Sequence, residues 1–261
     1  MKKTVLFLLS AVLLIFCCQS SVIAAPKSYS WYCPHVKGHV QPTSGKELAF
    51  VEALDGYYID RAHADPNAED KVIYLTFDAG YENGNVAKIL DVLKDEEVPA
   101  AFFILGNLIT KNSDLVRRMV NEGHTVCNHT VHHKDLSNVG REAFLKELED
   151  LESLYREHIG GDMARYYRPP EGRFSRENLE YAKQNGYKTV FWSFAYPDWD
   201  NGKQMSEERA KEIILNNIHN GEVMLLHPTS ETNAKILGSV IQALKKMGYR
   251  FCTLDELTQR V

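Results

Sequence analysis

Short apolar runs rich in β-branched and aromatic residues alternate along the chain with longer amphipathic segments of helical period. Runs that are apolar on both faces are typical of strands buried in a parallel sheet, and the longer segments are typical of helices. The pattern predicts strands at residues 72–77, 100–105, 125–129, 166–168, 189–194, 222–227 and 250–254. It predicts helices between them at residues 84–96, 113–122, 141–159, 176–185, 206–220 and 233–247.

The strict alternation of strands and helices predicts an α/β fold with a parallel sheet. An open doubly wound sheet would gather functional side chains at one switch point, whereas a closed (β/α) barrel brings the carboxyl end of every strand to a common mouth. Five of the seven predicted strands end in, or are soon followed by, a residue suited to acid–base or ligand chemistry. These residues are Asp78, His129 with His133, Arg168, Asp198 with Trp199, and His227. Only a ring gathers them all, so the sequence favours a barrel over an open sheet.

The N-terminus predicts a signal peptide over residues 1–24. Lys2 and Lys3 precede an apolar block, residues 5–18, and small residues follow up to Ala24. The block is shorter than the roughly 20 residues of a membrane-spanning helix, which favours cleavage after Ala24 over an uncleaved anchor. The mature protein is therefore expected to be secreted or extracytoplasmic.

Residues 25–70 predict a loop-rich N-terminal leader, with one helix around residues 46–54. Four prolines interrupt this segment: Pro26, Pro34, Pro42 and Pro66. We interpret it as a leader or a flap over a single barrel domain, residues 71–258. The chain has 261 residues, 44% of them hydrophobic, which is enough to bury a full core.

The net charge of the chain indicates which partners it does not bind, and its cysteine count indicates whether disulfides are expected. The formal net charge is −5, and loss of Lys2 and Lys3 with the signal peptide takes it to −7, which argues against nucleic acid or an anionic membrane. Three cysteines then remain, an odd number that does not make a disulfide framework. Cys127 and Cys252 are expected in the core, and a bridge from Cys33 to Cys252 stays open.

The segment Asn128–His133 carries His129 and His133 four residues apart. On one helical turn or in a tight loop, this spacing points both imidazoles the same way, which suits a shared divalent metal. For an isolated motif of this kind, a solvated histidine-rich loop is the alternative. His132 could also serve in place of either histidine.

The candidate residues at the other strand ends each allow a functional and a structural interpretation. Arg168 precedes a Pro-Pro turn, where it could orient an anionic partner or belong to a structural surface turn. Trp199 beside Asp198 makes a flat apolar wall with a polar edge, as sugar binding requires, whereas Trp192 is expected in the core. His227 ends an apolar strand, where a buried core histidine is the alternative to a catalyst.

The sequence lacks the motifs of several other enzyme classes. The sequence contains no G-x-G-x-x-G, P-loop, C-x-x-C, H-E-x-x-H or G-x-S-x-G segment. A nucleotide cofactor and a serine-hydrolase mechanism are therefore not expected.

In order, the segments TFDAG, HTVHH, RPPEG, PDW and LLH resemble the five motifs of the polysaccharide deacetylases, the NodB-homology group of carbohydrate esterases. Their wider context resembles the sporulation-type N-acetylmuramic acid deacetylases, which prepare cortex peptidoglycan for muramic δ-lactam formation. The resemblance implies a distorted (β/α) barrel of about seven parallel strands that hydrolyses an N-acetyl group of a glycan. It also implies a peptidoglycan strand as partner, a monomer, and a place in the cell envelope or the spore cortex space.

The resemblance also implies a role for each motif residue. Asp78 would be the general base that activates water, and His227 the general acid. Arg168 and Asp198 would position and tune the base. The substrate would contact Trp199, Leu225, Pro170 and Gly172.

By the same resemblance, His129 and His133 would hold a divalent metal ion such as zinc, manganese or cobalt. The family motif has a second aspartate as third ligand, and here Ala79 takes that position. Catalytic zinc normally has three protein ligands, so two histidines are expected to hold the ion more weakly. Asp78, water or substrate would have to complete its coordination shell. The sporulation-type group also tends to lack this aspartate.

Three further positions depart from the family pattern: Glu171, Ala195 and Pro228. Glu171 stands where many relatives have an aromatic residue, and its carboxylate could either repel an anionic substrate or pair with Arg173. Deacetylation of another glycan, such as a chitin-like oligosaccharide or acetylxylan, is an alternative function. A glycan-binding module that has lost catalysis is another.

Overall fold

The computed structural model describes residues 27–259 of the chain. The predicted signal peptide and its cleavage site lie outside these residues. Within the described part, no helix is long and apolar enough to cross a membrane.

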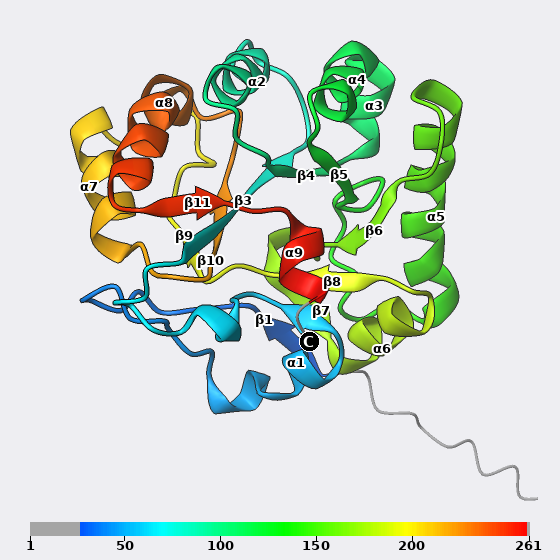
Figure 1. Ribbon diagram of the computed structural model, residues 1–261. Coiled ribbons are helices and arrows are strands. Elements are labelled where there is room, and N and C mark those ends of the chain that lie inside the picture. Colours follow the sequence, from blue (N-terminus) through cyan, green and yellow to red (C-terminus); the bar gives the residue numbers. More distant parts are fainter. Residues whose placement is uncertain (1–26, 260–261) are drawn as a thin grey trace, which may run out of the picture.

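The main sheet is parallel and runs in the order β2-β8-β6-β5-β4-β3-β10-β9, with β11 paired to the start of β3 (Figure 1). Its strands are β2 Gly56–Tyr57, β3 Lys71–Ala79, β4 Ala101–Ile104, β5 Thr125–Asn128, β6 Ala164–Tyr167, β8 Lys188–Val190, β9 Phe194–Ala195, β10 Glu222–Leu226 and β11 Tyr249–Phe251. A separate antiparallel pair joins β1, Ser28–Ser30, to β7, Arg173–Ser175. Each of the seven predicted strands has a counterpart in the main sheet.

The predicted strand 189–194 is interrupted, and the interruption distorts the barrel. Its first half, β8, pairs with β6, while its second half, β9, pairs with β10 at the other end of the sheet. Between them, Ser193 donates its backbone N–H to the carbonyl of Val223. A single stretch of chain therefore connects β8, next to the edge strand β2, with the opposite edge strand β9 of the curled sheet, and the predicted distorted (β/α) barrel is confirmed.

The helices lie mostly on the outer face of this sheet, except the last one, which packs against the apolar cluster of the inner face (Figure 1). They are α1 Phe50–Ala53, α2 Val86–Asp95, α3 Gly106–Lys111, α4 Ser113–Asn121, α5 Arg141–His158, α6 Arg176–Gln184, α7 Glu207–Asn217, α8 Glu231–Lys246 and α9 Leu254–Gln259, with 3-10 turns η1 Lys46–Leu48, η2 Arg61–His63 and η3 Pro170–Gly172. All six predicted helices form. The segment around residues 46–54 is η1 followed by the single turn of α1. The sequence did not predict α3 and α9, which are too short to show a helical period.

Alternation along β3 determines where its acid points. Ile73, Leu75 and Phe77 pack toward the helices, where complete burial of each side chain contributes about 1.5–3 kcal/mol. Val72 and Tyr74 belong to a second cluster inside the barrel. Successive side chains of a strand point to opposite faces, so Thr76 and Asp78 share this inner face. Asp78 therefore lies where the barrel interior opens.

The leader packs onto the barrel. β2 joins the main sheet, and Trp31 stacks on Phe191 with ring centroids 4.3 Å apart. The Trp31 indole also donates a hydrogen bond to the carbonyl of Trp192. The domain boundary at residue 71 stays a prediction.

The three cysteines of the described residues are buried, and none of them forms a disulfide. Cys127 and Cys252 belong to the inner apolar cluster, which confirms their expected place in the core. Cys33 is also buried, and all three are free thiols, so the bridge between Cys33 and Cys252 does not form.

Candidate active site

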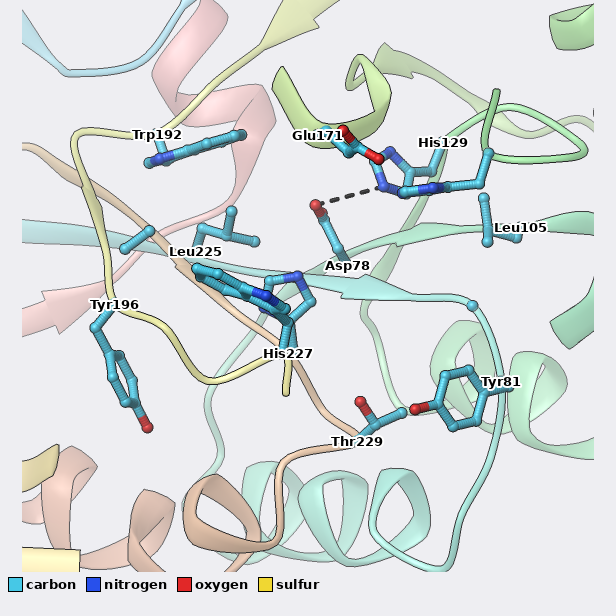
Figure 2. A pocket seen from close by; sticks show the side chains of 14 residues that line it. Asp78, Tyr81, Leu105, His129, Glu171, Trp192, Tyr196, Leu225, His227 and Thr229 are labelled. Atoms are coloured by element: carbon cyan, nitrogen blue, oxygen red, sulfur yellow. Dashed lines mark ion pairs between the residues drawn. The ribbon is translucent and has the colours of Figure 1, made fainter. Parts of the chain in front are cut away.

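A cavity of about 680 Å³ opens at the carboxyl ends of the strands, the mouth that the sequence predicted (Figure 2). Six of the predicted residues line it: Asp78, His129, His133, Trp199, Leu225 and His227. Asp78 and His227 thus face one shared cavity. Arg168 and Asp198 lie behind its wall, where each contacts one of these two residues.

Asp78 is held by Arg168. The Nη1 group of Arg168 donates a 2.8 Å hydrogen bond to Oδ1 of Asp78, which leaves Oδ2 directed toward the cavity side. Burial raises the pKa of Asp78, but interactions with His129, Arg168 and His227 outweigh burial and hold this pKa below its ordinary value. The carboxylate is therefore ionised at neutral pH and can accept a proton.

Arg168 follows β6 and is completely buried. Its other donors are satisfied by the carbonyl of Val190 at 2.9 Å, the hydroxyl of Thr76 at 2.9 Å and the carbonyl of Phe191 at 3.1 Å. Its guanidinium carbon also lies 4.0 Å from the ring centroid of Phe103. These contacts fix the planar fork in one orientation, so Arg168 orients the base rather than the substrate.

His129 is buried just past β5, and its tautomer is set by the backbone. Its Nδ1 lies 2.9 Å from the carbonyl of Arg168, which can only accept, so Nδ1 carries the proton. Burial lowers the pKa of His129 to about 4, against the opposing charge of Asp78, and the ring is neutral at neutral pH. The lone pair of Nε2 then faces Oδ2 of Asp78 at 3.5 Å. Two acceptors that face each other favour a proton donor or a cation between them.

His133 lies in the tight loop that follows β5, and its ring centroid is 5.0 Å from that of His129. Thr130 and His133 both adopt left-handed backbone conformations, with φ of 71° and 58°, and these turn the loop back over the cavity. His132 points elsewhere, because Glu147 accepts from its ring nitrogen at 3.0 Å. Of the three histidines, His129 and His133 are therefore the pair at the cavity.

The residues present fit a divalent ion held by two imidazoles, with the Asp78 carboxylate nearby. Across residues 27–259, no group of three or more histidine, cysteine or acidic side chains could hold a metal ion. Ala79 supplies no third ligand, because a methyl group carries no donor atom, and its side chain is buried in the apolar cluster that faces the helices. Such a site suits a weakly held ion whose remaining positions are filled by water or substrate.

His227 faces Asp78 from the end of β10 and is paired with Asp198. Its Nδ1 lies 2.7 Å from Oδ1 of Asp198, and its backbone N–H donates to Oδ2 over 2.8 Å. Burial lowers the pKa of His227, but the hydrogen bond and the charge of Asp198 outweigh burial and raise it above 6.5. Family resemblance suggested that Asp198 positions the base. The structure instead places it beside His227, because the segment after β9 runs next to β10.

The predicted substrate contacts divide into two groups. Leu225 lines the floor, and Trp199 stands at the rim with 60% of its surface exposed and its ring at an angle of 64° to that of His227. Pro170 and Gly172 are buried and do not line the cavity, while Glu171 between them does. The contribution of Pro170 and Gly172 to substrate binding stays a prediction.

Two residues that line the cavity were not predicted from the sequence to do so. Trp192, expected in the core, is half-buried and lines the cavity, because it lies in the interruption between β8 and β9. Tyr81 also lines the cavity, and its hydroxyl accepts a hydrogen bond from Asn201 near Trp199. A tyrosine four residues beyond a predicted strand gives no signal of its own. The break in the apolar strand could have been suspected only from its polar Ser193.

An ionised carboxylate and a histidine with a raised pKa on one cavity suit hydrolysis of an amide. The reaction requires a base for the attacking water and an acid for the departing amine. The barrel mouth supplies both, together with an aromatic rim suited to a sugar ring. Fold and site thus define a hydrolase of amide C–N bonds in glycans.

Comparison with known proteins agrees with this class. The family model described as "Polysaccharide deacetylase" matches residues 65–190. The peptidoglycan-N-acetylmuramic acid deacetylase PdaA of Bacillus subtilis is 38% identical over 87% of this chain and 85% of its own length. A peptidoglycan-N-acetylglucosamine deacetylase of Bacillus cereus is 32% identical over 74% of this chain and 90% of its own. The chain belongs to the polysaccharide deacetylase family, and it is a polysaccharide N-deacetylase.

The fold agrees as well. The solved structure of Bacillus subtilis PdaA, a family 4 carbohydrate esterase, superimposes with a TM-score of 0.83 at 36% sequence identity. The match covers 89% of this chain and 97% of the other.

Proposed function

We propose that this chain removes the N-acetyl group from N-acetylmuramic acid in peptidoglycan. The similarity to PdaA over most of both chains supports the substrate class. The observation that carries the proposal is that Asp78 and His227 line one cavity with opposite pKa shifts. These shifts give the base its ionised form and the acid its protonated form at the same pH.

The geometry supports the following proton transfers. Oδ2 of Asp78 accepts a proton from the water that attacks the acetamide carbon, while Arg168 holds Oδ1. The attack forms a C–O bond and a tetrahedral intermediate. As the C–N bond breaks, His227 donates its Nε2 proton to the departing nitrogen, because Asp198 occupies Nδ1. The products are acetate and a free amine on the sugar.

His129 and His133 would hold a divalent ion, which would polarise the acetamide carbonyl. His129 is well prepared for this role, because the Arg168 carbonyl fixes its Nδ1 proton and leaves Nε2 free to bind. Zinc, manganese and cobalt are the ions to compare.

The biological setting follows from the same resemblance. A muramic acid freed of its acetyl group can close to a δ-lactam, so the chain would act before lactam formation in the spore cortex. It would work outside the cytoplasm as a monomer on the glycan strand.

Acetate release from defined glycans tests the proposal. The mature protein is incubated, with and without added zinc, manganese or cobalt, with oligosaccharides of alternating N-acetylglucosamine and N-acetylmuramic acid, with the muramic carboxyl either free or amidated. Chitin oligosaccharides and acetylxylan are run in parallel. We expect acetate from the muramic sugar, located by mass spectrometry, and at least a hundredfold less with Asp78→Asn, about the factor a general base contributes. Acetate only from chitin or xylan would contradict the proposal.

A further inference from the structure

Two helices of the barrel begin with the same sequence pattern, a serine followed three residues later by an asparagine. Ser175 and Asn178 stand at the start of α6, and Ser230 and Asn233 at the start of α8. In both helices the serine hydroxyl accepts a hydrogen bond from the backbone N–H of the asparagine, over 3.2 Å in α6 and 3.1 Å in α8. Both asparagine side chains are buried. The two positions therefore have the same local role to fill at a helix start.

The two asparagine side chains nevertheless bind different groups. Oδ1 of Asn178 accepts a 3.0 Å hydrogen bond from the backbone N–H of Ser175, which completes a capping box and stabilises the start of α6. The side chain of Asn233 turns away from its own helix. Its Nδ2 donates to Oδ2 of Asp198 over 2.6 Å and to the carbonyl of His227 over 3.1 Å. A buried residue that departs from the local rule in this way points to a requirement of the site.

The groups around Asn233 fix the orientation of its amide. A carboxylate and a carbonyl face one side of it, and both can only accept, so the nitrogen must lie on that side. On the other side, Oδ1 accepts a hydrogen bond from the hydroxyl of Tyr196. Burial raises the pKa of Tyr196, so this hydroxyl keeps its proton. Of side chains of this size, only an amide can donate twice and accept in this arrangement.

Asn233 acts on the reaction only through its neighbours. It is completely buried and lies outside the cavity lining. Tyr196 does line the cavity, and Figure 2 shows its hydroxyl pointing away from Asp78. Hydrogen bonds thus run from the cavity wall through Asn233 to Asp198, and from Asp198 to Nδ1 of His227.

We infer that Asn233 is a positioning residue for the acid step of the reaction. It holds the Asp198 carboxylate and the backbone of His227 in one arrangement, so that the His227 ring presents Nε2 to the departing nitrogen. This inference rests on the proposed function, in which His227 is the general acid. It gives a role to an asparagine that lies outside the five motifs of the family.

Asn233→Asp tests this role, because an aspartate of the same shape offers at most one proton where the amide offers two. At least one of the two hydrogen bonds is lost, and an ionised carboxylate there would repel Asp198. Two substrates are compared with the same added ion throughout. The amine of the glycan acetamide must be protonated as it leaves, whereas the nitrophenolate of 4-nitrophenyl acetate leaves without a proton. We expect kcat for the acetamide to fall about tenfold to a hundredfold with little change in KM, and kcat for the ester to stay close to wild type.

Asn178→Asp is the matched control, because it makes the same change at the same position of a buried helix start. Nδ2 of Asn178 has no partner within residues 27–259, so this change removes no hydrogen bond and keeps the accepting Oδ1. The ratio of the two kcat values should equal that of wild type. If Asn233→Asp does not fold, Tyr196→Phe takes its place. That variant removes the hydroxyl that fixes the amide and should lower the ratio about twofold to tenfold, as loss of one hydrogen bond predicts.

NMR gives a second measurement that needs no turnover. The Nδ1 proton of His227, held by Asp198 over 2.7 Å, should give a downfield signal, assigned by its absence in His227→Gln. We expect this signal to shift in Asn233→Asp and to keep its position in Asn178→Asp. Equal losses of kcat on the two substrates, or a signal that does not move, would overturn the inference. If wild type releases no acetate from the muramic sugar, the proposed function fails, and the NMR signal alone then decides the inference.

Discussion

Asp198 accepts a hydrogen bond from Nδ1 of His227 over 2.7 Å and so decides which nitrogen of that ring faces the cavity. Its second oxygen accepts from the His227 backbone and from the side chain of Asn233, at 2.8 and 2.6 Å. The carboxylate is buried and held from three directions, so the His227 ring has one orientation. Asp198 thereby positions the acid and raises the pKa of His227.

Asp198→Asn should therefore move the alkaline limb of the pH profile. His227 acts as an acid only while protonated, so activity is lost as pH rises through its pKa, which lies above 6.5 in wild type. Loss of the negative charge lowers this pKa, and we expect the limb to shift by about one unit toward lower pH. The measurement is kcat/KM for acetate release against pH.

The acid limb is the internal control for this variant. It reports ionisation of Asp78, whose pKa lies below its ordinary value and does not depend on contact with Asp198. It should stay in place. An alkaline limb that does not move in Asp198→Asn would show that His227 is not the titrating acid.

Arg168→Met should destabilise the fold as well as the site. It removes the buried partner of Asp78, and the loss of one member of a buried ion pair costs about 3–5 kcal/mol. Urea denaturation measures this free energy. Arg209→Met is the control, because Arg209 and Glu212 are both more than half exposed, and loss of such a pair costs less than about 1 kcal/mol. Equal losses in the two variants would contradict a structural role for Arg168.

The periodic parts of the fold could be predicted from the sequence because their burial is periodic. β3 is buried along nearly its whole length, and its apolar run marks it without ambiguity. The rule that parallel strands point their carboxyl ends the same way was then enough to bring Asp78, His129 and His227 to one cavity.

Pairings between distant segments could not be predicted in the same way. Single-sequence patterns carry no information on which side chain meets which, so the contact of Asp198 with His227 and the capture of His132 by Glu147 were missed. The two-residue strand β2 is stabilised by pairing with β8, and the short helix α3 by packing against α4 and α5, rather than by local propensity. For the same reason, the sequence did not predict that Trp192 lines the cavity. Its side chain packs partly against the core and forms part of the cavity wall.

Gly172→Ala should damage the cavity wall. Gly172 has φ of 65°, and a Cβ there would lie 2.9 Å from Cη2 of Trp192 and 3.0 Å from Cβ of Trp31. One ring must shift to accommodate it, and Trp192 lines the cavity. We expect a loss of about 2–4 kcal/mol in the free energy of unfolding, from backbone strain plus overpacking, and a raised KM.

Gly161→Ala separates these two causes. Gly161 has a similar φ of 70°, but a Cβ there would meet nothing within 4 Å. It should cost only the backbone strain, about 1–2 kcal/mol, and leave KM unchanged. If both alanines cost the same and neither changes KM, the contact with Trp192 has no role in shaping the cavity.

Metal binding distinguishes the histidine pair from its neighbour. Zinc titration by calorimetry should give an affinity that falls at least tenfold in His133→Ala, since even loss of a group that only supports a ligand costs about that much. His132→Ala should change the affinity little, because Glu147 holds that ring away from His129. The two histidines are adjacent, so charge and composition are matched. Equal weakening in both variants would mean that zinc binds the exposed loop rather than the imidazole pair at the cavity.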